Sequence, residues 1–336
     1  METFSQHDVS ICIVGWNQVH LSSACLKSIV EQTKAVTYEI IFVDNNSSDG
    51  TSELVRSEFP SVKLIVNQTN LGFGRANNQA LRVARGKYCL LLNNDMLLAS
   101  DAVSRMVEYM DAHADVGVLG CRLVYPSGAV QMSAHGDPDW YDHLFHSLYL
   151  NRLMPKSCIF GNTDCTYLDF QAKDLAVEVG YVAGAALMVR TASLGEVGLF
   201  DEKIFLCAED WEWCRRFARH GYRVFYYSGA EIVHYHGMSS IRSVSPNRDL
   251  VRQRSVLYLT ASSHYVYRKL HAKQPFRILA FTFCFRLHWL SRLLGHGVLY
   301  LIGDSKANLG VIRGFFEGAV LPYRHLAVQY LNSDTK

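Results

Sequence analysis

The sequence predicts an α/β fold in which helices flank a mainly parallel sheet. Over the first 125 residues, short apolar runs alternate with helical patterns, which is the order that crossover connections between parallel strands require. The expected strands are apolar almost throughout, as in a sheet that helices cover on both faces. Hydrophobic residues make up 49% of the 336-residue chain, so a large core can be buried.

The predicted elements alternate regularly. Residues 20–33 and 51–59 carry apolar side chains at helical spacing, and Ser100 or Asp101 caps a helix that ends near residue 113. A Gly-rich loop precedes another helix at about residues 75–84. The expected strands of the first 125 residues are 9–14, 38–50, 62–68, 87–95 and 116–124, and the second of these runs into a polar turn. Farther along the chain we expect strands at residues 182–190, 223–228 and 230–237, and a helix that begins near residue 209.

The segment from residue 125 to 181 lacks regular periodicity and is rich in aromatic residues, His, Asp and Gly. A connection of this length is either functional or mobile, and we expect it to be an insertion beside the site. We therefore divide the chain into an α/β domain at residues 1–245, with the irregular segment inside it, and a helical tail at residues 246–336.

The tail is apolar and aromatic, with Arg, His and Lys interleaved. This pattern favours a helix that lies in the headgroup region of a membrane. One stretch approaches bilayer thickness, but Arg286, His288 and Arg292 interrupt it, so a single spanning helix fits less well. The alternatives are a helical subdomain that packs on the first domain, or a homodimer interface.

Charge and cysteine content exclude some classes of function. The net charge of +2, with no Lys/Arg run in the first 240 residues, argues against a nucleic-acid partner. The nine cysteines form no Cys-x-x-Cys pair, so a zinc site is not expected. The odd number of cysteines and the absence of a secretory pattern at the N-terminus favour a reducing compartment, so we expect a protein that is not exported.

Polar side chains follow the first four predicted strands. The fourth strand, for example, ends in "LLLNND", where Asn93, Asn94 and Asp95 follow an apolar run. In an open parallel sheet, ligands bind beyond the carboxyl ends of the strands. A carboxylate there can bind Mg²⁺ or Mn²⁺, which complete their coordination with substrate phosphates. The alternative for Asn94 and Asp95 is a turn that caps the next helix.

Nucleotide sites of two other kinds fit poorly. Gly72-Phe73-Gly74 resembles half of a dinucleotide fingerprint, but Asn77 stands where the third glycine belongs, and the motif follows the third strand rather than the first. The phosphate-binding pattern G-x-x-x-x-G-K-[ST] is absent. Dehydrogenase and nucleoside-triphosphatase chemistry therefore lose most of their support.

Two further motifs carry groups that can do chemistry. In "LCAEDWEWCRRF", Glu209 and Asp210 open a helix, where carboxylates interact favourably with the helix dipole. Neighbouring tryptophans would partly exclude water, which raises a carboxylate pKa and suits a general base. In "VHYHG", His234 and His236 alternate, so they face the same way on a strand, and a neutral imidazole can bind a metal. Each feature taken alone is also consistent with a purely structural role.

Taken together, the motifs resemble family 2 glycosyltransferases of the GT-A fold, and most of all the rhamnosyltransferase-like branch that builds bacterial surface polysaccharides. The matching stretches are "VSICIVGWN", "EIIFVDNNSSDGT", "NLGFGRANNQAL", "GKYCLLLNND", "GYVAGAALMVR", "VGLFDEKIF", "EDWEWCRR" and "IVHYHGMSS", which together cover about residues 8–240. The resemblance implies that Asp44 contacts the donor nucleobase, that Asn17, Gly72, Asn77 and Asn94 border the nucleotide, that Asp95 and His234 bind the metal, that Asp210 is the general base, and that Asn93, Glu209 and His236 are secondary candidates.

The resemblance also implies a reaction. We expect an inverting, Mg²⁺- or Mn²⁺-dependent hexosyltransferase that moves a sugar, with rhamnose from dTDP-rhamnose as the leading candidate, to a lipid-linked glycan. Residues 125–181 would shape the acceptor side, and the enzyme would sit peripherally on the cytoplasmic face of the bacterial inner membrane. Asn93 departs from the family's acidic metal motif, so the cation should be held less tightly until the diphosphate arrives. The alternatives are a non-catalytic sugar-nucleotide-binding scaffold, or transfer of another hexose from a UDP or GDP donor.

Overall fold

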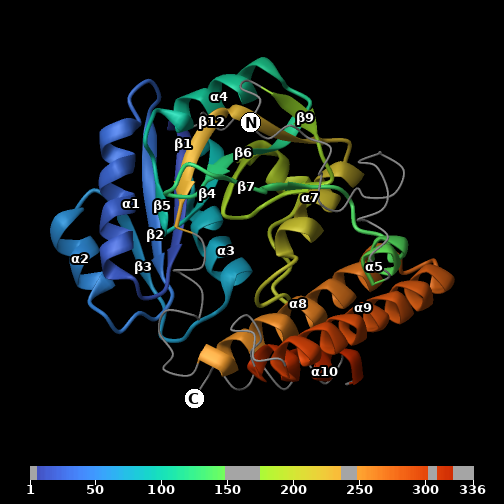
Figure 1. The fold of residues 1–336 in the computed structure, drawn as a ribbon. Helices are drawn as coiled ribbons and strands as arrows, with labels where there is room; N and C mark the ends of the chain where they lie inside the picture. Colours follow the sequence, from blue (N-terminus) through green and yellow to red (C-terminus); the bar gives the residue numbers. More distant parts are fainter. Residues whose placement is uncertain (1–5, 148–174, 236–247, 302–308, 321–336) are drawn as a thin grey trace. The chain divides into compact units, whose positions relative to one another are not determined.

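The structure is a computed structural model, and it describes residues 6–147, 175–235, 248–301 and 309–320 (Figure 1). The chain divides into two compact units, which are described separately here. Unit 1 comprises Met1–His135, Asp169–Lys203 and Glu209–Ser240, and unit 2 comprises Gly136–Leu168, Ile204–Ala208 and Ile241–Lys336. Residues 136–147, the described part of a segment that we predicted to belong to the α/β domain, are assigned to unit 2.

Unit 1 is built on a ten-stranded sheet in the order β3-β2-β1-β4-β11-β6-β12-β5, with β7 beside β6 and β9 beside β12. Strands β3, β2, β1 and β4 run parallel, as β6 and β12 do, whereas β11 is antiparallel between β4 and β6. The sheet is therefore mixed. Its strands are β1 (His7–Gly15), β2 (Tyr38–Asp44), β3 (Lys63–Val66), β4 (Gly86–Asn93), β5 (Met96–Leu97), β6 (Val116–Val124), β7 (Val130–Gln131), β9 (Ala176–Glu178), β11 (Ala186–Arg190) and β12 (Arg223–His234).

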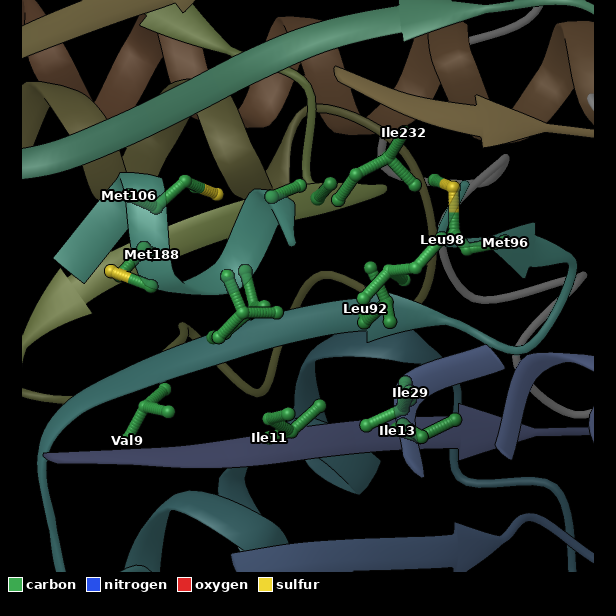
Figure 2. Packing of buried hydrophobic residues seen from close by; sticks show 14 of the residues in the cluster. Val9, Ile11, Ile13, Ile29, Leu92, Met96, Leu98, Met106, Met188 and Ile232 are labelled. Atoms are coloured by element: carbon green, nitrogen blue, oxygen red, sulfur yellow. The ribbon is translucent and has the colours of Figure 1, made fainter. Parts of the chain in front are cut away.

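Helices of unit 1 cover both faces of this sheet, as the apolar strands predict. Alternate residues of each strand enter one of two separate cores. On one face the strands pack against α1 (Val19–Gln32), α2 (Thr51–Glu58) and α4 (Ala102–Ala112), and on the other they pack against α3 (Phe73–Val83) and α7 (Glu209–Arg219). Figure 2 shows the first core, where Val9, Ile11 and Ile13 follow one another along β1.

Most predicted elements appear close to their expected bounds, and two differ in an instructive way. The strand expected at 182–190 is broken into β10 (Tyr181–Val182), which pairs with β8 (Ala134–His135), and β11. The two strands expected at 223–228 and 230–237 form the single strand β12, with a register shift between Tyr227 and Glu231. Of the two candidate caps for α4, Asp101 is the one whose side chain accepts a hydrogen bond from Ser104.

Unit 2 is helical where the structure describes it. Helix α5 (Trp140–Ser147) packs against α9 (Pro275–Leu301), with the His143 ring against Phe281 and Phe285. Helices α8 (Arg248–Leu270) and α10 (Leu309–Val320) are the other described helices of unit 2. The short helix α6 (Leu194–Val197) and a 3₁₀ turn (Thr191–Ser193) belong to unit 1. Among the described residues, none of the helices combines the length and apolarity needed to cross a membrane.

Candidate active site

The end of β1 is joined to the loop that follows β2. Asn17 adopts a left-handed backbone conformation (φ 59°), which an Asn tolerates better than most residues. Its side-chain oxygen accepts a hydrogen bond from the backbone N–H of Ser48 (2.9 Å), and its own N–H donates to the Ser47 hydroxyl (2.7 Å). Asn17, which we predicted to border the donor nucleotide, thus holds the polar loop after β2 in place.

Asp44 is the last residue of β2 and is buried. One carboxylate oxygen accepts from the N–H of Ser47 (2.8 Å), and the other accepts from the hydroxyl of Ser52. Both oxygens therefore shape the loop that runs into α2. Contact between Asp44 and a nucleobase stays a prediction.

A network of amide side chains supports the Gly-rich loop before α3. The Asn45 side chain donates to Asn70 (2.9 Å) and to the carbonyl of Gly72 (3.3 Å), and accepts from Asn67 (3.1 Å). Asn67 in turn exchanges hydrogen bonds with Gln79. The sequence analysis missed this network, although Asn45 and Asn67 directly follow two strands, which is a signal that could have revealed it.

Two residues of the predicted nucleotide pocket occupy different positions in this loop. Gly72 has φ 81°, a conformation that favours glycine, and stands directly before α3. Asn77 is buried, and its amide donates back to the carbonyl of Phe73 (3.0 Å). The Asn77 side chain therefore supports the first turn of α3.

The "LLLNND" motif ends β4 and turns into β5. Asn94 is buried, and its amide donates to the hydroxyl of Ser22 (2.9 Å) and to the carbonyl of Asn17 (3.3 Å). Asn93 is half-buried, and its backbone N–H donates to the carbonyl of Ala185 in the segment before β11. Asn94 thus couples the "LLLNND" motif to the end of β1.

The structure brings Asp95 together with His234, from strands 139 positions apart in sequence. The Nε2 atom of His234 lies 3.4 Å from Oδ1 of Asp95, and both side chains are buried. The Tyr235 N–H also donates to the carbonyl of Asp95 (3.0 Å), which pins the end of β12 beside the motif. His236, the alternative metal ligand, lies outside the described residues.

Gln131 fixes the orientation of the His234 ring. Its amide nitrogen donates to the backbone carbonyl of His234 (2.7 Å), so its amide oxygen faces Nδ1 of the ring (2.9 Å). Because an amide oxygen can only accept, this arrangement places a proton on Nδ1, and Nε2 is the ring nitrogen that lies toward Asp95. The sequence analysis missed Gln131, because it lies on a two-residue strand in the aperiodic segment.

Asp210 lies at the start of α7 and is half-buried. One of its oxygens accepts from the N–H of Gly184 (3.0 Å), and the other accepts from the N–H of Trp211 (2.8 Å). A methyl group placed on Gly184 would lie 3.4 Å from the Phe73 ring and 3.5 Å from Cβ of Asp210. The candidate base and the first residue of α3 therefore meet across Gly184.

The neighbouring Glu209 is in a different environment. It is buried, and its Oε2 atom has no hydrogen-bond partner among the described residues. Burial, together with the negative charge of Asp210, raises the pKa of the Glu209 carboxyl from 4.5 to about 8. Near neutral pH Glu209 is therefore largely protonated.

A segment between β11 and α7 is tied to both α3 and α7. Arg216 of α7 forms an ion pair with buried Glu212 (2.8 Å) and donates to the carbonyls of Val197 (2.7 Å) and Leu199 (2.5 Å). From the other side, Asn78 of α3 accepts from the N–H of Phe200 and donates to its carbonyl. We call residues 197–202 the bridging segment. Its contacts connect α3, which follows the Gly-rich loop, with α7, which begins beside the candidate base Asp210.

With this geometry established, comparison with known proteins identifies the family. Residues 10–172 match the family model described as Glycosyl transferase family 2. This stretch carries a family 2 glycosyltransferase domain. The resemblance seen in the sequence is thereby confirmed.

Relatives of this chain include a rhamnosyltransferase and an O-antigen biosynthesis protein. The N-acetylglucosaminyl-diphospho-decaprenol L-rhamnosyltransferase of Mycobacterium tuberculosis is 25% identical over 214 residues, which cover 60% of this chain and 68% of that protein. The O-antigen biosynthesis protein RfbC of Myxococcus xanthus is 25% identical over 245 residues, which cover 72% of this chain and 18% of that protein.

A solved structure confirms the predicted GT-A fold. The mannosyltransferase PcManGT from Pyrobaculum calidifontis, in complex with GDP-Man and Mn²⁺, superposes with a TM-score of 0.52 at 17% identity. The match covers 99% of this chain and 89% of that one. At this identity the likeness establishes the fold alone.

Proposed function

We propose that this glycosyltransferase moves a sugar from a nucleoside-diphosphate donor to a hydroxyl of a lipid-linked glycan, with inversion at the anomeric carbon and with a divalent cation. The observation that carries the proposal is the convergence of Asp95 and His234, 3.4 Å apart at neighbouring strand ends. These residues were chosen from separate sequence motifs, and folding brings them together. The lipid-linked acceptor and the membrane surface as its location are supported by the decaprenol-linked substrate in the name of the mycobacterial relative.

The residues at this position suit a divalent cation. Carboxylate oxygen and imidazole nitrogen are both ligands for Mn²⁺, and Nε2 of His234 lies 3.4 Å from Oδ1 of Asp95. Among the described residues no group of three or more His, Cys, Asp or Glu gathers as a metal site, so diphosphate oxygens and water would complete the coordination. When bound, the cation supplies positive charge against the diphosphate that leaves.

Asp210 takes the proton in this proposal. Two backbone N–H groups orient its carboxyl group, which in this proposal accepts a proton from the attacking hydroxyl. The acceptor oxygen then displaces the diphosphate in one step, which inverts the anomeric configuration. Neighbouring Glu209 is buried, and with a pKa of about 8 its carboxyl already holds a proton near neutral pH, so Asp210 is the better base of the two.

Rhamnose is the leading candidate for the sugar, supported by the mycobacterial rhamnosyltransferase. The mannosyltransferase complex with GDP-Man keeps a GDP-linked hexose as the alternative donor. A thermal-shift screen of dTDP-rhamnose, UDP-hexoses and GDP-mannose, each with Mn²⁺ or Mg²⁺, separates these donors. The donor that stabilises the protein is expected to do so only with metal.

The variant Asp210→Asn tests the proposal directly. We expect transfer to fall by about 10²–10⁴-fold, the usual effect of removing a general base, with donor affinity largely retained. Donor affinity is measured by calorimetry, and transfer is measured with a polyprenyl-diphosphate-linked saccharide. Transfer by Asp210→Asn at the wild-type rate would refute the assignment, and absence of any donor turnover by the wild type would favour a non-catalytic scaffold.

A further inference from the structure

One face of α9 exposes a continuous apolar stripe. Phe276, Leu279, Phe283, Leu290 and Leu294 are between 44% and 73% exposed. At 100° per residue these five positions fall within about 60° of arc on the helix. We call this set the α9 stripe. Five large apolar side chains aligned on one surface mark an interaction site rather than scattered surface residues.

The opposite face of the same helix is already used. Phe281, Phe285 and Trp289 are buried, and they contact aromatic rings of α5, α8 and α10. Helix α9 is therefore held in unit 2 by one face, while the α9 stripe faces away from that packing. A stripe of this kind on an anchored helix suits a flat apolar partner.

The charge of the chain identifies the partner. Residues 241–336 contain fourteen Lys or Arg and four Asp or Glu, a net charge of +10, whereas residues 1–240 contain nineteen and twenty-seven, a net charge of −8. Exposed basic residues just before α9 in the sequence include Arg268, Lys269 and Lys273. Apolar side chains together with an excess of positive charge are the composition of helices that lie in anionic membrane surfaces.

We propose that the α9 stripe inserts into the interface of an anionic lipid bilayer while the basic residues of the tail contact its headgroups. A second copy of the chain is a poorer partner for the stripe, because two tails that each carry a net charge of +10 repel each other. This inference specifies how the protein contacts the membrane named in the proposed function, and any role of that contact in catalysis rests on the proposed function. The test of membrane binding, however, requires no sugar transfer.

The test is vesicle co-sedimentation of the full-length protein. Wild-type protein is expected to bind vesicles of phosphatidylglycerol and phosphatidylcholine, to bind pure phosphatidylcholine vesicles at least tenfold more weakly, and to lose most binding at high salt. The double variant Leu279→Ser/Phe283→Ser should reduce binding to the anionic vesicles at least tenfold. Val30→Ser, which alters an exposed apolar residue of α1, is the matched control and should bind like wild type.

The outcomes separate this proposal from its rivals. Unchanged binding by the double variant, or no binding by the wild type, overturns it. Sedimentation velocity adds a further check. If the wild type is a dimer that does not bind vesicles, and the double variant is a monomer, the stripe serves self-association.

Hydrolysis of the donor is measured in parallel. Vesicle binding without donor turnover in the wild type would refute the proposed function and leave the membrane inference standing.

Discussion

At the scale of single residues, two adjacent carboxyls at the start of α7 are given different properties by their surroundings. Asp210 accepts hydrogen bonds from two backbone N–H groups, whereas one oxygen of Glu209 is buried without a partner among the described residues. Hydrogen bonds from N–H groups stabilise a carboxylate, and burial without them favours the neutral acid. Glu209 is therefore largely protonated near neutral pH, while Asp210 is oriented by two backbone hydrogen bonds.

The raised pKa of Glu209 predicts a dependence of stability on pH. The carboxyl has a pKa of about 8 in the folded protein and an ordinary value of 4.5 when unfolded. Between these values the unfolded state releases a proton that the folded state keeps, so the free energy of unfolding falls as pH rises. This loss in the free energy of unfolding is absent below pH 4.5 and reaches about 3 kcal/mol at pH 7.

Glu209→Gln should remove this penalty. Urea unfolding is expected to show the variant gaining more stability over wild type at pH 8 than at pH 5. Glu108→Gln, a change of an exposed residue on α4, is the control and should show no such difference. An equal effect of Glu209→Gln at both pH values would contradict the assignment.

Gln131 is expected to act on the metal through His234. Its contact with Nδ1 orients the ring so that Nε2 lies on the side of Asp95, and loss of such supporting contacts typically weakens metal affinity 10- to 100-fold. We therefore expect Gln131→Leu to weaken binding of Mn²⁺ in the presence of nucleoside diphosphate, measured from free Mn²⁺ by electron paramagnetic resonance.

The control for this prediction removes a different buried hydrogen bond nearby. The buried Ser133 hydroxyl donates to the carbonyl of Cys121 (2.9 Å). Ser133→Ala should therefore lower thermal stability slightly while Mn²⁺ affinity stays near wild type. Equal losses of affinity in both variants would indicate a general loss of structure.

The sequence was informative about residues whose role depends on their chemistry and less so about those that support them. Asp95 and His234 could be singled out because carboxylate and imidazole at strand ends suggest a metal. Gln131 and Asn45 could not, because an amide acts by what it happens to face, and that depends on contacts between segments distant in sequence. Asn77 was chosen from its position in a motif, and the hydrogen bond of its amide within its own helix could not be foreseen from that position.

At the scale of elements, the strand patterns predicted the sheet well because burial on both faces leaves a clear apolar run. The break between β10 and β11 was not visible, since the residues there are small and apolar like their neighbours. It has a physical role, because it releases the N–H of Gly184 from the ladder to bind Asp210. The insertion of antiparallel β11 between β4 and β6 also escaped prediction, because pairing direction leaves no mark in the apolar pattern.

The bridging segment predicts an effect of Glu212 on stability. Glu212 is fully buried and pairs with Arg216, which also holds two carbonyls of that segment. Breaking one partner of a buried ion pair leaves a charge without compensation and costs about 3 kcal/mol. Glu212→Gln should therefore lower the free energy of unfolding by about that amount.

An exposed ion pair provides the comparison. Glu53 lies 3.9 Å from Arg56 on the surface of α2, and pairs of this kind contribute at most about 1 kcal/mol. Glu53→Gln should therefore be nearly neutral in urea unfolding. A loss in Glu212→Gln no larger than in Glu53→Gln would show that the bridging segment does not depend on this pair.

At the scale of the whole molecule, the chain passes between its two units several times. Unit 2 is assembled from three separate segments, of which residues 241–336 are the largest. Unit 2 therefore contains residues from three parts of the chain, and not the C-terminal tail alone. Within unit 2, His143 of α5 packs edge-on against Phe281 (5.0 Å) and Phe285 (4.6 Å) of α9.

This organisation predicts what truncation after residue 245 would do. Removing α9 takes away the aromatic partners of α5, so the apolar side chains of α5 would meet water. We expect the truncated chain to bind the dye ANS and to melt at a lower temperature than the full-length protein, whereas Leu279→Ser/Phe283→Ser should do neither because its changes lie on an exposed face. Equal melting temperatures and no dye binding after truncation would mean that the first 245 residues fold independently. Loss of vesicle binding is therefore better tested by the double variant than by deletion, because only the former leaves the packing of unit 2 intact.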